Sequence, residues 1–158
     1  MYHPPFPPVK DLSTLIDSII LIDDDEDDLD LFADALESLK IPVTFKTFKN
    51  GEAFLDYLQN ADTSNKLKVF LDLNMPIISG IDVLKQVKSS TKTANIWITI
   101  YSTSSSPNDV EVTYSYGANS YLQKPTSFND LKKYILKSLE RYVDTETSIS
   151  RDAFLINF

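Results

Sequence analysis

Short β-prone apolar runs alternate five times along the chain with segments that carry an apolar stripe at helical spacing. An apolar run of about five residues between turn-forming residues is typical of a buried strand. Apolar residues three and four positions apart are typical of a helix that packs one face on a core. The alternation predicts an α/β domain, in which helices cover both faces of a parallel sheet. The predicted strands are 18–22, 43–48, 69–71, 96–101 and 119–123, and the predicted helices follow at 29–39, 53–58, 81–87, 110–116 and 131–142.

The composition excludes several classes of active site. The sequence contains no cysteine, and its only histidine, His3, lies among prolines, so a thiolate site or a histidine-based triad is not expected. A formal net charge of −8 argues against binding nucleic acid through its phosphates. No apolar run reaches the roughly 20 residues of a membrane span, and no signal-peptide pattern occurs. We therefore expect a cytoplasmic protein that binds neither nucleic acid nor membranes.

The length of 158 residues favours one domain with flanking segments. Residues 1–16 are rich in proline and predict an extended arm. Residues 17–143 contain all the strand–helix repeats and form the predicted domain. Residues 144–158 turn from polar to apolar, ending in Phe154-Leu-Ile-Asn-Phe158. We expect this tail to dock on the domain, to bind a partner or to be disordered.

Polar residues follow four of the predicted strands directly. Asp23 and Asp24 follow the first strand, Asp72 the third, Ser102 the fourth and Lys124 the fifth. Because parallel strands open their carboxyl ends on one edge of the sheet, these side chains should converge there. Three carboxylates would repel one another, and Mg²⁺ relieves that repulsion with oxygen ligands. A carboxylate next to a metal, an ammonium group and a hydroxyl is equipped to accept a phosphoryl group.

At these residues the chain resembles the response regulator receiver family, in its stand-alone form similar to chemotaxis regulators. The resemblance covers about residues 18–142. It implies a flavodoxin-like, doubly wound sheet of five parallel strands in the order 2-1-3-4-5, with five helices. The matching motifs are Ile22-Asp-Asp24, Leu71-Asp-Leu-Asn-Met-Pro76 with Gly80, Tyr101-Ser-Thr103, and Gly117-Ala with Tyr121-Leu-Gln-Lys-Pro125.

The resemblance implies that Asp72 is the phosphoacceptor of a Mg²⁺-dependent reaction. By the same resemblance, Mg²⁺ is held by the carboxylates of Asp24 and Asp72, by the backbone carbonyl of Asn74 and, through water, by Asp23. The run of acids leaves the register of the acidic pair open by one residue, within 23–25. We assign the acids at 25–28 to the exposed first turn of a helix, where they suit the helix dipole.

The other implied roles concern the phosphoryl group after transfer. Lys124 would pair with Asp72 at rest and with the phosphoryl group afterwards, and Ser102 and Thr103 would contact it. Ser102 and Tyr121 would act as the switch, with Tyr121 moving inward. This movement would reshape the face formed by the fourth helix, the fifth strand and the fifth helix.

The resemblance implies a signalling protein and not a multiple-turnover enzyme. Such a protein takes a phosphoryl group from a sensor histidine kinase or a phosphotransfer protein, and slowly hydrolyses it. Its output would pass to a further protein, or through a homodimer formed at the switch face. The family often has a cis peptide bond after the lysine, which makes the bond between Lys124 and Pro125 a candidate.

Two other hypotheses remain open on the sequence alone. One is a receiver-like scaffold that is never phosphorylated and works by constitutive dimerisation. The other is a Mg²⁺-dependent phosphohydrolase with an aspartyl nucleophile. In such enzymes a second Asp commonly follows two residues after the first, whereas this chain has Asn74 there.

Overall fold

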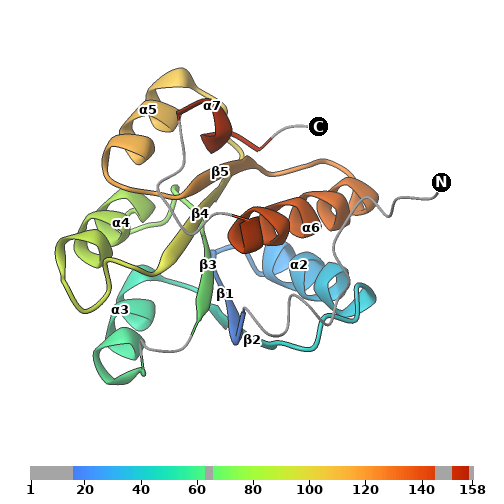
Figure 1. Ribbon diagram of the computed structural model, residues 1–158, viewed down its shortest axis with the longest axis horizontal. Coiled ribbons are helices and arrows are strands. Elements are labelled where there is room, and N and C mark those ends of the chain that lie inside the picture. Colours follow the sequence, from blue (N-terminus) through green and yellow to red (C-terminus); the bar gives the residue numbers. More distant parts are fainter. Residues whose placement is uncertain (1–15, 63–65, 145–150, 157–158) are drawn as a thin grey trace.

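Five parallel strands form the centre of the computed structural model, which describes residues 16–62, 66–144 and 151–156 (Figure 1). The strands lie in the order β2-β1-β3-β4-β5, and every pairing is parallel, which confirms the predicted flavodoxin-like topology. The strand order reverses beside β1 and β3, and the carboxyl ends of strands at such a reversal are where open α/β sheets bind ligands. The strands are β1 (Ser18–Ile22), β2 (Thr44–Phe48), β3 (Leu67–Leu71), β4 (Trp97–Ser102) and β5 (Ser120–Gln123).

Helices cover both faces of this sheet, as the alternating pattern predicts (Figure 1). On one face lie α2 (Glu26–Ser38) and α6 (Phe128–Asp144). On the other face lie α3 (Gly51–Asn60), α4 (Gly80–Ser89) and α5 (Pro107–Ser115). A short further helix, α7 (Arg151–Phe154), lies beside α5 and β5. No helix in the described part of the chain is long and apolar enough to cross a membrane.

Each face of the sheet has its own hydrophobic core, because successive side chains of a strand point to opposite faces. In β3, Val69 and Leu71 point into the core under α3, α4 and α5, whereas Phe70 points into the core under α2 and α6. Phe32 of α2 packs on Phe70 with their ring centroids 5.0 Å apart. Burial on both faces explains why the central strands read as continuous apolar runs.

Polar caps fix where the helices next to the carboxyl edge begin. The side chain of Asp25 caps α2, that of Ser79 caps α4 and that of Ser106 caps α5, each by accepting a backbone N–H of the first turn. Such a cap is typically worth about 1 kcal/mol. The caps therefore hold the loops after β1, β3 and β4 close to the ends of their strands.

The ends of the domain differ in part from the expected organisation. Residues 1–15 of the predicted arm lie outside the described residues, but Ile16 is buried in the core under α2 and α6. Part of the predicted tail docks on the domain, since Phe154 and Ile156 are both buried. Docking is thus the outcome found for residues 154–156.

The expected cis peptide bond before Pro125 was wrong. The bond between Lys124 and Pro125 is trans, and no cis peptide bond occurs in the described residues. The trans form of an X–Pro bond is intrinsically favoured by about 0.5–1 kcal/mol. In addition, the backbone N–H of Lys124 donates to the carbonyl of Ser102 at 2.7 Å, which continues the pairing of β4 and β5 up to this residue.

Candidate metal and phosphoacceptor site

The register of the strands brings the predicted site residues to one edge of the sheet. Ile22 of β1 is paired with Leu71 of β3, so Asp23 and Asp72 leave adjacent strand ends at the same level. The backbone N–H of Asp72 donates to the carbonyl of Ile22 at 3.0 Å and extends this pairing by one residue. The two acids are therefore positioned by the ladder itself.

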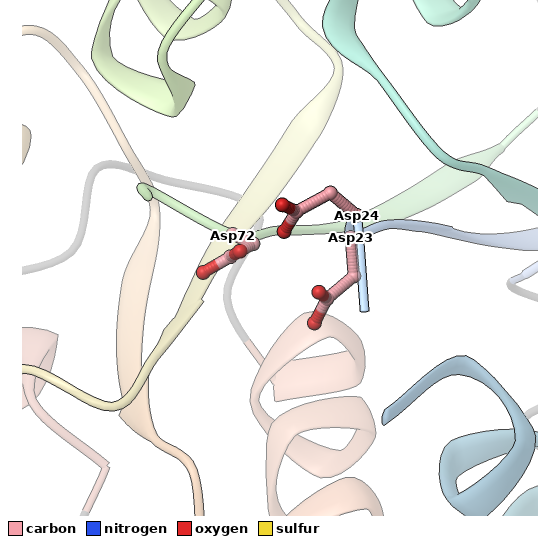
Figure 2. A group of neighbouring side chains, drawn as sticks. All are labelled: Asp23, Asp24 and Asp72. Atoms are coloured by element: carbon pink, nitrogen blue, oxygen red, sulfur yellow. The ribbon is translucent and has the colours of Figure 1, made fainter. Parts of the chain in front are cut away.

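Asp23, Asp24 and Asp72 form a cluster of three carboxylates at this edge (Figure 2). One oxygen of each can be chosen so that the three lie within 4.8 Å of one another. Asp23 is fully buried and Asp72 is 4% exposed, whereas Asp24 is exposed to solvent. Hard divalent cations prefer carboxylate oxygens, so this donor set fits such an ion. Of the three acids between which the register was left open, Asp23 and Asp24 belong to the cluster; that they bind a metal stays a prediction.

Burial raises the pKa of Asp72 to about 6, and the neighbouring carboxylates of Asp23 and Asp24 add to this effect. The ammonium group of Lys124 and the backbone N–H of Asn74 oppose it by favouring the charged form. Burial likewise raises the pKa of Asp23. Placing two anions side by side in this edge therefore costs free energy, which a bound cation would offset.

Lys124 lies between three acids and is itself largely buried, with 10% of its side chain exposed. Its Nζ is 2.7 Å from Asp23 Oδ2, 2.8 Å from Asp28 Oδ2 and 3.7 Å from Asp72 Oδ1. Burial by itself would lower the pKa of Lys124, but the hydrogen bonds to Asp23 and Asp28 raise it above its usual value. The lysine is thus fully protonated and is held close to Asp72.

Asp28 is a member of this site that the sequence analysis missed. Its predicted place in the first turn of a helix is confirmed, but it is half-buried there and not the exposed surface acid expected. It is the third residue of α2 and binds Lys124 across the edge of the sheet. One signal pointed to it, because Asp28 lies four residues before the buried Phe32 and so shares the inward face of the helix. Asp25 and Asp27 are exposed, as predicted.

Ser102, Thr103 and Tyr121 lie around the end of β4. Ser102 is fully buried, and its Oγ accepts a hydrogen bond from the backbone N–H of Ser104 at 3.2 Å. Thr103 is exposed. Tyr121 is buried and points inward, where its hydroxyl donates to the carbonyl of Ser104 at 2.8 Å. Tyr121 thus already lies inward in this structure, so the inward movement expected for it has no outward starting position here. Its switch role and the contacts of Ser102 and Thr103 with a phosphoryl group remain predictions.

The loop from Asp72 to α4 is held tightly at one end and exposed in its middle. The backbone N–H of Gly80 donates to the carbonyl of Leu73 at 2.9 Å. A Cβ at Gly80 would collide with the carbonyl oxygen of Asp72 and would lie 2.7 Å from Leu73 Cα, so only glycine fits. Ile77, at the tip, has a left-handed backbone with φ of 69° and is 94% exposed. Asn74 is also exposed, and its predicted carbonyl contact to a metal is untested.

Comparison with known proteins assigns the class. The response regulator receiver domain family matches residues 19–136, and the chain belongs to this family. It is a receiver of two-component signal transduction, as its relatives are. A probable methanogenesis regulatory protein, FilR2 of Methanothrix harundinacea (strain 6Ac), is 36% identical over 120 residues, which cover 74% of this chain and 77% of that protein.

Two solved structures support the fold and the class. The phosphorylated cyanobacterial phytochrome response regulator RcpA has a TM-score of 0.73 and 27% identity, over 85% of this chain and 99% of that one. The Mn²⁺-bound form of response regulator Rcp1 has a TM-score of 0.70 and 25% identity, over 85% and 99% of the two chains.

Proposed function

We propose that Asp72 accepts a phosphoryl group from the phosphohistidine of a sensor histidine kinase or phosphotransfer protein, in a reaction that requires Mg²⁺. The observation that carries this proposal is the combination of three clustered carboxylates with Lys124 Nζ only 3.7 Å from Asp72 Oδ1. A nucleophilic carboxylate, a cation site and a fixed ammonium group are the parts that phosphoryl transfer to an aspartate needs.

The chemistry of the donor set supports a divalent cation at this edge. Asp24 and Asp72 would bind Mg²⁺ through their carboxylates and Asn74 through its backbone carbonyl. Asp23 would act through water, because its Oδ1 already accepts from the N–H of Asp25 and its Oδ2 from Lys124. When bound, the cation would neutralise charge on the phosphoryl oxygens and on the acids. The similar response regulator Rcp1 has a solved Mn²⁺-bound form, which supports a divalent cation at this edge.

In the transfer, a carboxylate oxygen of Asp72 forms a bond to phosphorus while the phosphorus–nitrogen bond of the donor histidine breaks. The electron pair of that bond stays on the imidazole nitrogen, which takes up a proton from solvent. Lys124 then contacts a phosphoryl oxygen, and we assign Ser102 and Thr103 the remaining contacts. Slow hydrolysis reverses the modification: the oxygen of a water molecule bonds to phosphorus, the bond from phosphorus to Asp72 breaks, and inorganic phosphate and the free carboxylate of Asp72 result. The protein is in this proposal a phosphoacceptor and not a multiple-turnover enzyme.

The output of the modification would pass through Tyr121. In this proposal Ser102 turns toward the phosphoryl group, and the Tyr121 side chain changes its contacts in response. The face formed by α5, β5 and α6 then changes shape and is read by a downstream protein or by a second copy of the chain. The hydrogen bond from Tyr121 to Ser104, two residues beyond Ser102, supports a mechanical link between these groups.

Incubation with acetyl phosphate and Mg²⁺ tests the proposal directly. Intact-mass spectrometry should detect one added phosphoryl group on the wild type and none on Asp72→Ala. Asp34→Asn, which changes an exposed acid on α2, is the matched control and should label like the wild type. If wild type and Asp72→Ala label equally, or if labelling does not depend on Mg²⁺, the proposal is wrong.

A further inference from the structure

The side chain of Lys124 has to cross the end of β4 to reach its acidic partners. Lys124 follows β5, at one edge of the sheet, whereas Asp72 follows β3 and Asp23 follows β1. In the strand order β1-β3-β4-β5, strand β4 lies between the lysine and both acids. The side chain that β4 presents at this level therefore forms the surface over which the lysine extends.

The register of β4 and β5 identifies that side chain as Tyr101. Tyr101 is paired with Leu122, and both side chains belong to the core under α2 and α6. Lys124 lies two residues beyond Leu122 and shares its face of the sheet, because side chains alternate along a strand. A residue and the diagonal neighbour of its partner are within reach when one is aromatic and the other long. Accordingly, Lys124 Nζ lies over the Tyr101 ring, 5.3 Å from the ring centroid.

Two further rings fix the orientation of the Tyr101 side chain. Phe32 of α2 packs edge-to-face against it, with the ring centroids 5.6 Å apart and an interplanar angle of 78°. Phe70 of β3 packs in the same manner, at 6.4 Å and 84°. Tyr101 is only 2% exposed, so its ring has little room to turn. The ring therefore presents a fixed face to the ammonium group of Lys124.

An aromatic face suits this place because the lysine is largely removed from water. A ring attracts a cation that lies within about 6 Å of its centroid, and the attraction is stronger where water is excluded. Only 10% of the Lys124 side chain is exposed. An aliphatic side chain at position 101 would leave the desolvated ammonium group without compensation on this side. A carboxylate would bind it in one direction, whereas a ring face attracts it without fixing which oxygen it contacts.

We propose that Tyr101 is a positioning residue for phosphoryl transfer to Asp72, a role that rests on the proposed function of that acid. The Tyr101 ring keeps the Lys124 side chain extended across β4. The ammonium group, 2.8 Å from Asp28 Oδ2 and 3.7 Å from Asp72 Oδ1, can then move from Asp28 to a phosphoryl oxygen without leaving the site. Without the ring, the lysine side chain turns toward solvent for part of the time, and transfer slows.

Two substitutions separate the ring of Tyr101 from its hydroxyl group. Tyr101→Leu removes the ring, and we expect labelling by acetyl phosphate and Mg²⁺ to be at least about threefold slower, as for loss of a cation–π contact. Tyr101→Phe keeps the ring and should label like the wild type. Both variants should bind Mg²⁺ with wild-type affinity, because neither removes an oxygen ligand. The matched control is Tyr57→Leu, which removes a ring facing Lys46 from α3, on the opposite face of the sheet, and should label like the wild type.

NMR spectroscopy tests the contact without any phosphorylation. Protons over the face of an aromatic ring are shifted upfield. The ε-methylene resonances of Lys124 should therefore lie upfield of those of the exposed Lys133 in the wild type and in Tyr101→Phe. In Tyr101→Leu they should return toward the position of Lys133. Lys124 resonances at the Lys133 position in the wild type would overturn the proposal, even if Tyr101→Leu does not fold.

The labelling outcomes distinguish this inference from the proposed function. If the wild type is labelled on Asp72 and Tyr101→Leu is labelled as fast, the positioning role is wrong and the phosphoacceptor assignment stands. The role is also wrong if Tyr101→Phe is as slow as Tyr101→Leu, or if Tyr101→Leu loses affinity for Mg²⁺ as well, since the substitution then disturbs the whole site. If the wild type is labelled no more than Asp72→Ala, the proposed function itself is wrong, and the role of Tyr101 in it is wrong too.

Discussion

Lys124 Nζ lies 2.8 Å from Asp28 Oδ2 but 3.7 Å from Asp72 Oδ1, so the lysine is held closer to the first turn of α2 than to the proposed phosphoacceptor. Asp23 holds the same ammonium group at 2.7 Å. A phosphoryl group on Asp72 must therefore draw Lys124 away from at least one existing partner. Asp28 is the more exposed of the two, with 31% of its side chain accessible, and is the one whose contact is more easily broken.

Substitution Asp28→Asn should accelerate phosphorylation of Asp72, because the lysine then loses one competing carboxylate. A hydrogen bond between charged groups is worth about 1.5–3 kcal/mol, of which only part is recovered at the transition state, so we expect labelling by acetyl phosphate to be about three- to tenfold faster. The measurement is the initial rate by intact-mass spectrometry. Asp27→Asn is the matched control, since Asp27 lies in the same helical turn but is exposed, and it is Asp28 that pairs with Lys124. Unchanged or slower labelling of Asp28→Asn would contradict competition for the lysine.

Binding of Mg²⁺ should weaken as the pH falls through about 6, the pKa to which burial raises Asp72. A proton on Asp72 competes with the cation for the same oxygen, so each unit below that pKa should cost up to roughly tenfold in affinity. Isothermal titration calorimetry at pH 7.5, 6.5 and 5.5 measures this dependence. An affinity that stays constant over the range would show that Asp72 does not bind the cation.

The free energy of unfolding of the metal-free protein should be higher for Asp72→Asn than for the wild type at pH 7. The pKa of Asp72 in the folded protein, about 6, lies above its ordinary value of 3.8. The folded state therefore binds a proton more tightly than the unfolded chain, and the wild type loses stability as the pH rises from about 4 to 6. The neutral amide avoids this loss, which amounts to roughly 1–3 kcal/mol. Urea unfolding at pH 7 and pH 4 should show a difference only at pH 7.

Gly80→Ala should destabilise the domain far more than Gly117→Ala. A Cβ at position 80 collides with the backbone of Asp72 and Leu73, which cannot move without shifting the end of β3. At position 117 the nearest atom is Lys88 Cγ at 3.5 Å, and only the positive φ of 95° adds a cost of roughly 1–2 kcal/mol. Thermal unfolding of both variants measures the contrast. Equal thermal unfolding midpoints of the two variants would show that the loop after Asp72 accommodates a Cβ at position 80 without cost.

Phosphorylation should accelerate amide exchange in residues 154–156 if Tyr121 changes its contacts. Tyr121 donates its hydroxyl to Ser104, pairs its backbone with Leu155 and Ile156, and lies beside Phe154. Movement of Tyr121 would therefore disturb its ring contact with Phe154 and its backbone pairing with Leu155 and Ile156. Hydrogen exchange with and without acetyl phosphate and Mg²⁺ measures the effect in the wild type. The Asp72→Ala variant, treated identically, should show no change. If phosphorylation leaves amide exchange in the wild type unchanged, Tyr121 does not respond to the phosphoryl group on Asp72, and the prediction is wrong.

The sheet was predictable from the sequence because its strands are short, apolar and buried on both faces. The convergence of Asp23, Asp72 and Lys124 followed from the direction of parallel strands alone. The strand predicted at 69–71 was too short. β3 begins at Leu67, and it includes Lys68, whose Nζ is buried and lies 2.6 Å from Thr99 Oγ1. Burial lowers the pKa of Lys68 well below its usual value. The sequence does not predict this burial, because a lysine side chain is almost never fully buried.

Contacts between distant residues account for the rest of what the sequence analysis missed. Asp28 reaches Lys124 because the first turn of α2 and the residue after β5 both lie at the carboxyl edge of the sheet, and no local pattern encodes that distance. The docking of Phe154 likewise depends on a pocket built by α5 and β5. The cis peptide bond before Pro125 was expected from family resemblance alone, and the bond is trans.

The bridge between Tyr121 and Leu155 also has a consequence for how the protein is made. During translation, β5 is synthesised well before the segment 154–156 that pairs with its outer edge. The residues between Gln123 and Leu155 take about 2–6 s to synthesise at typical rates. During that interval the nascent domain carries an open strand edge, a surface prone to pair with another chain. Neighbouring nascent chains on one messenger RNA would then be each other's nearest alternative partner until the segment 154–156 emerges and covers the edge.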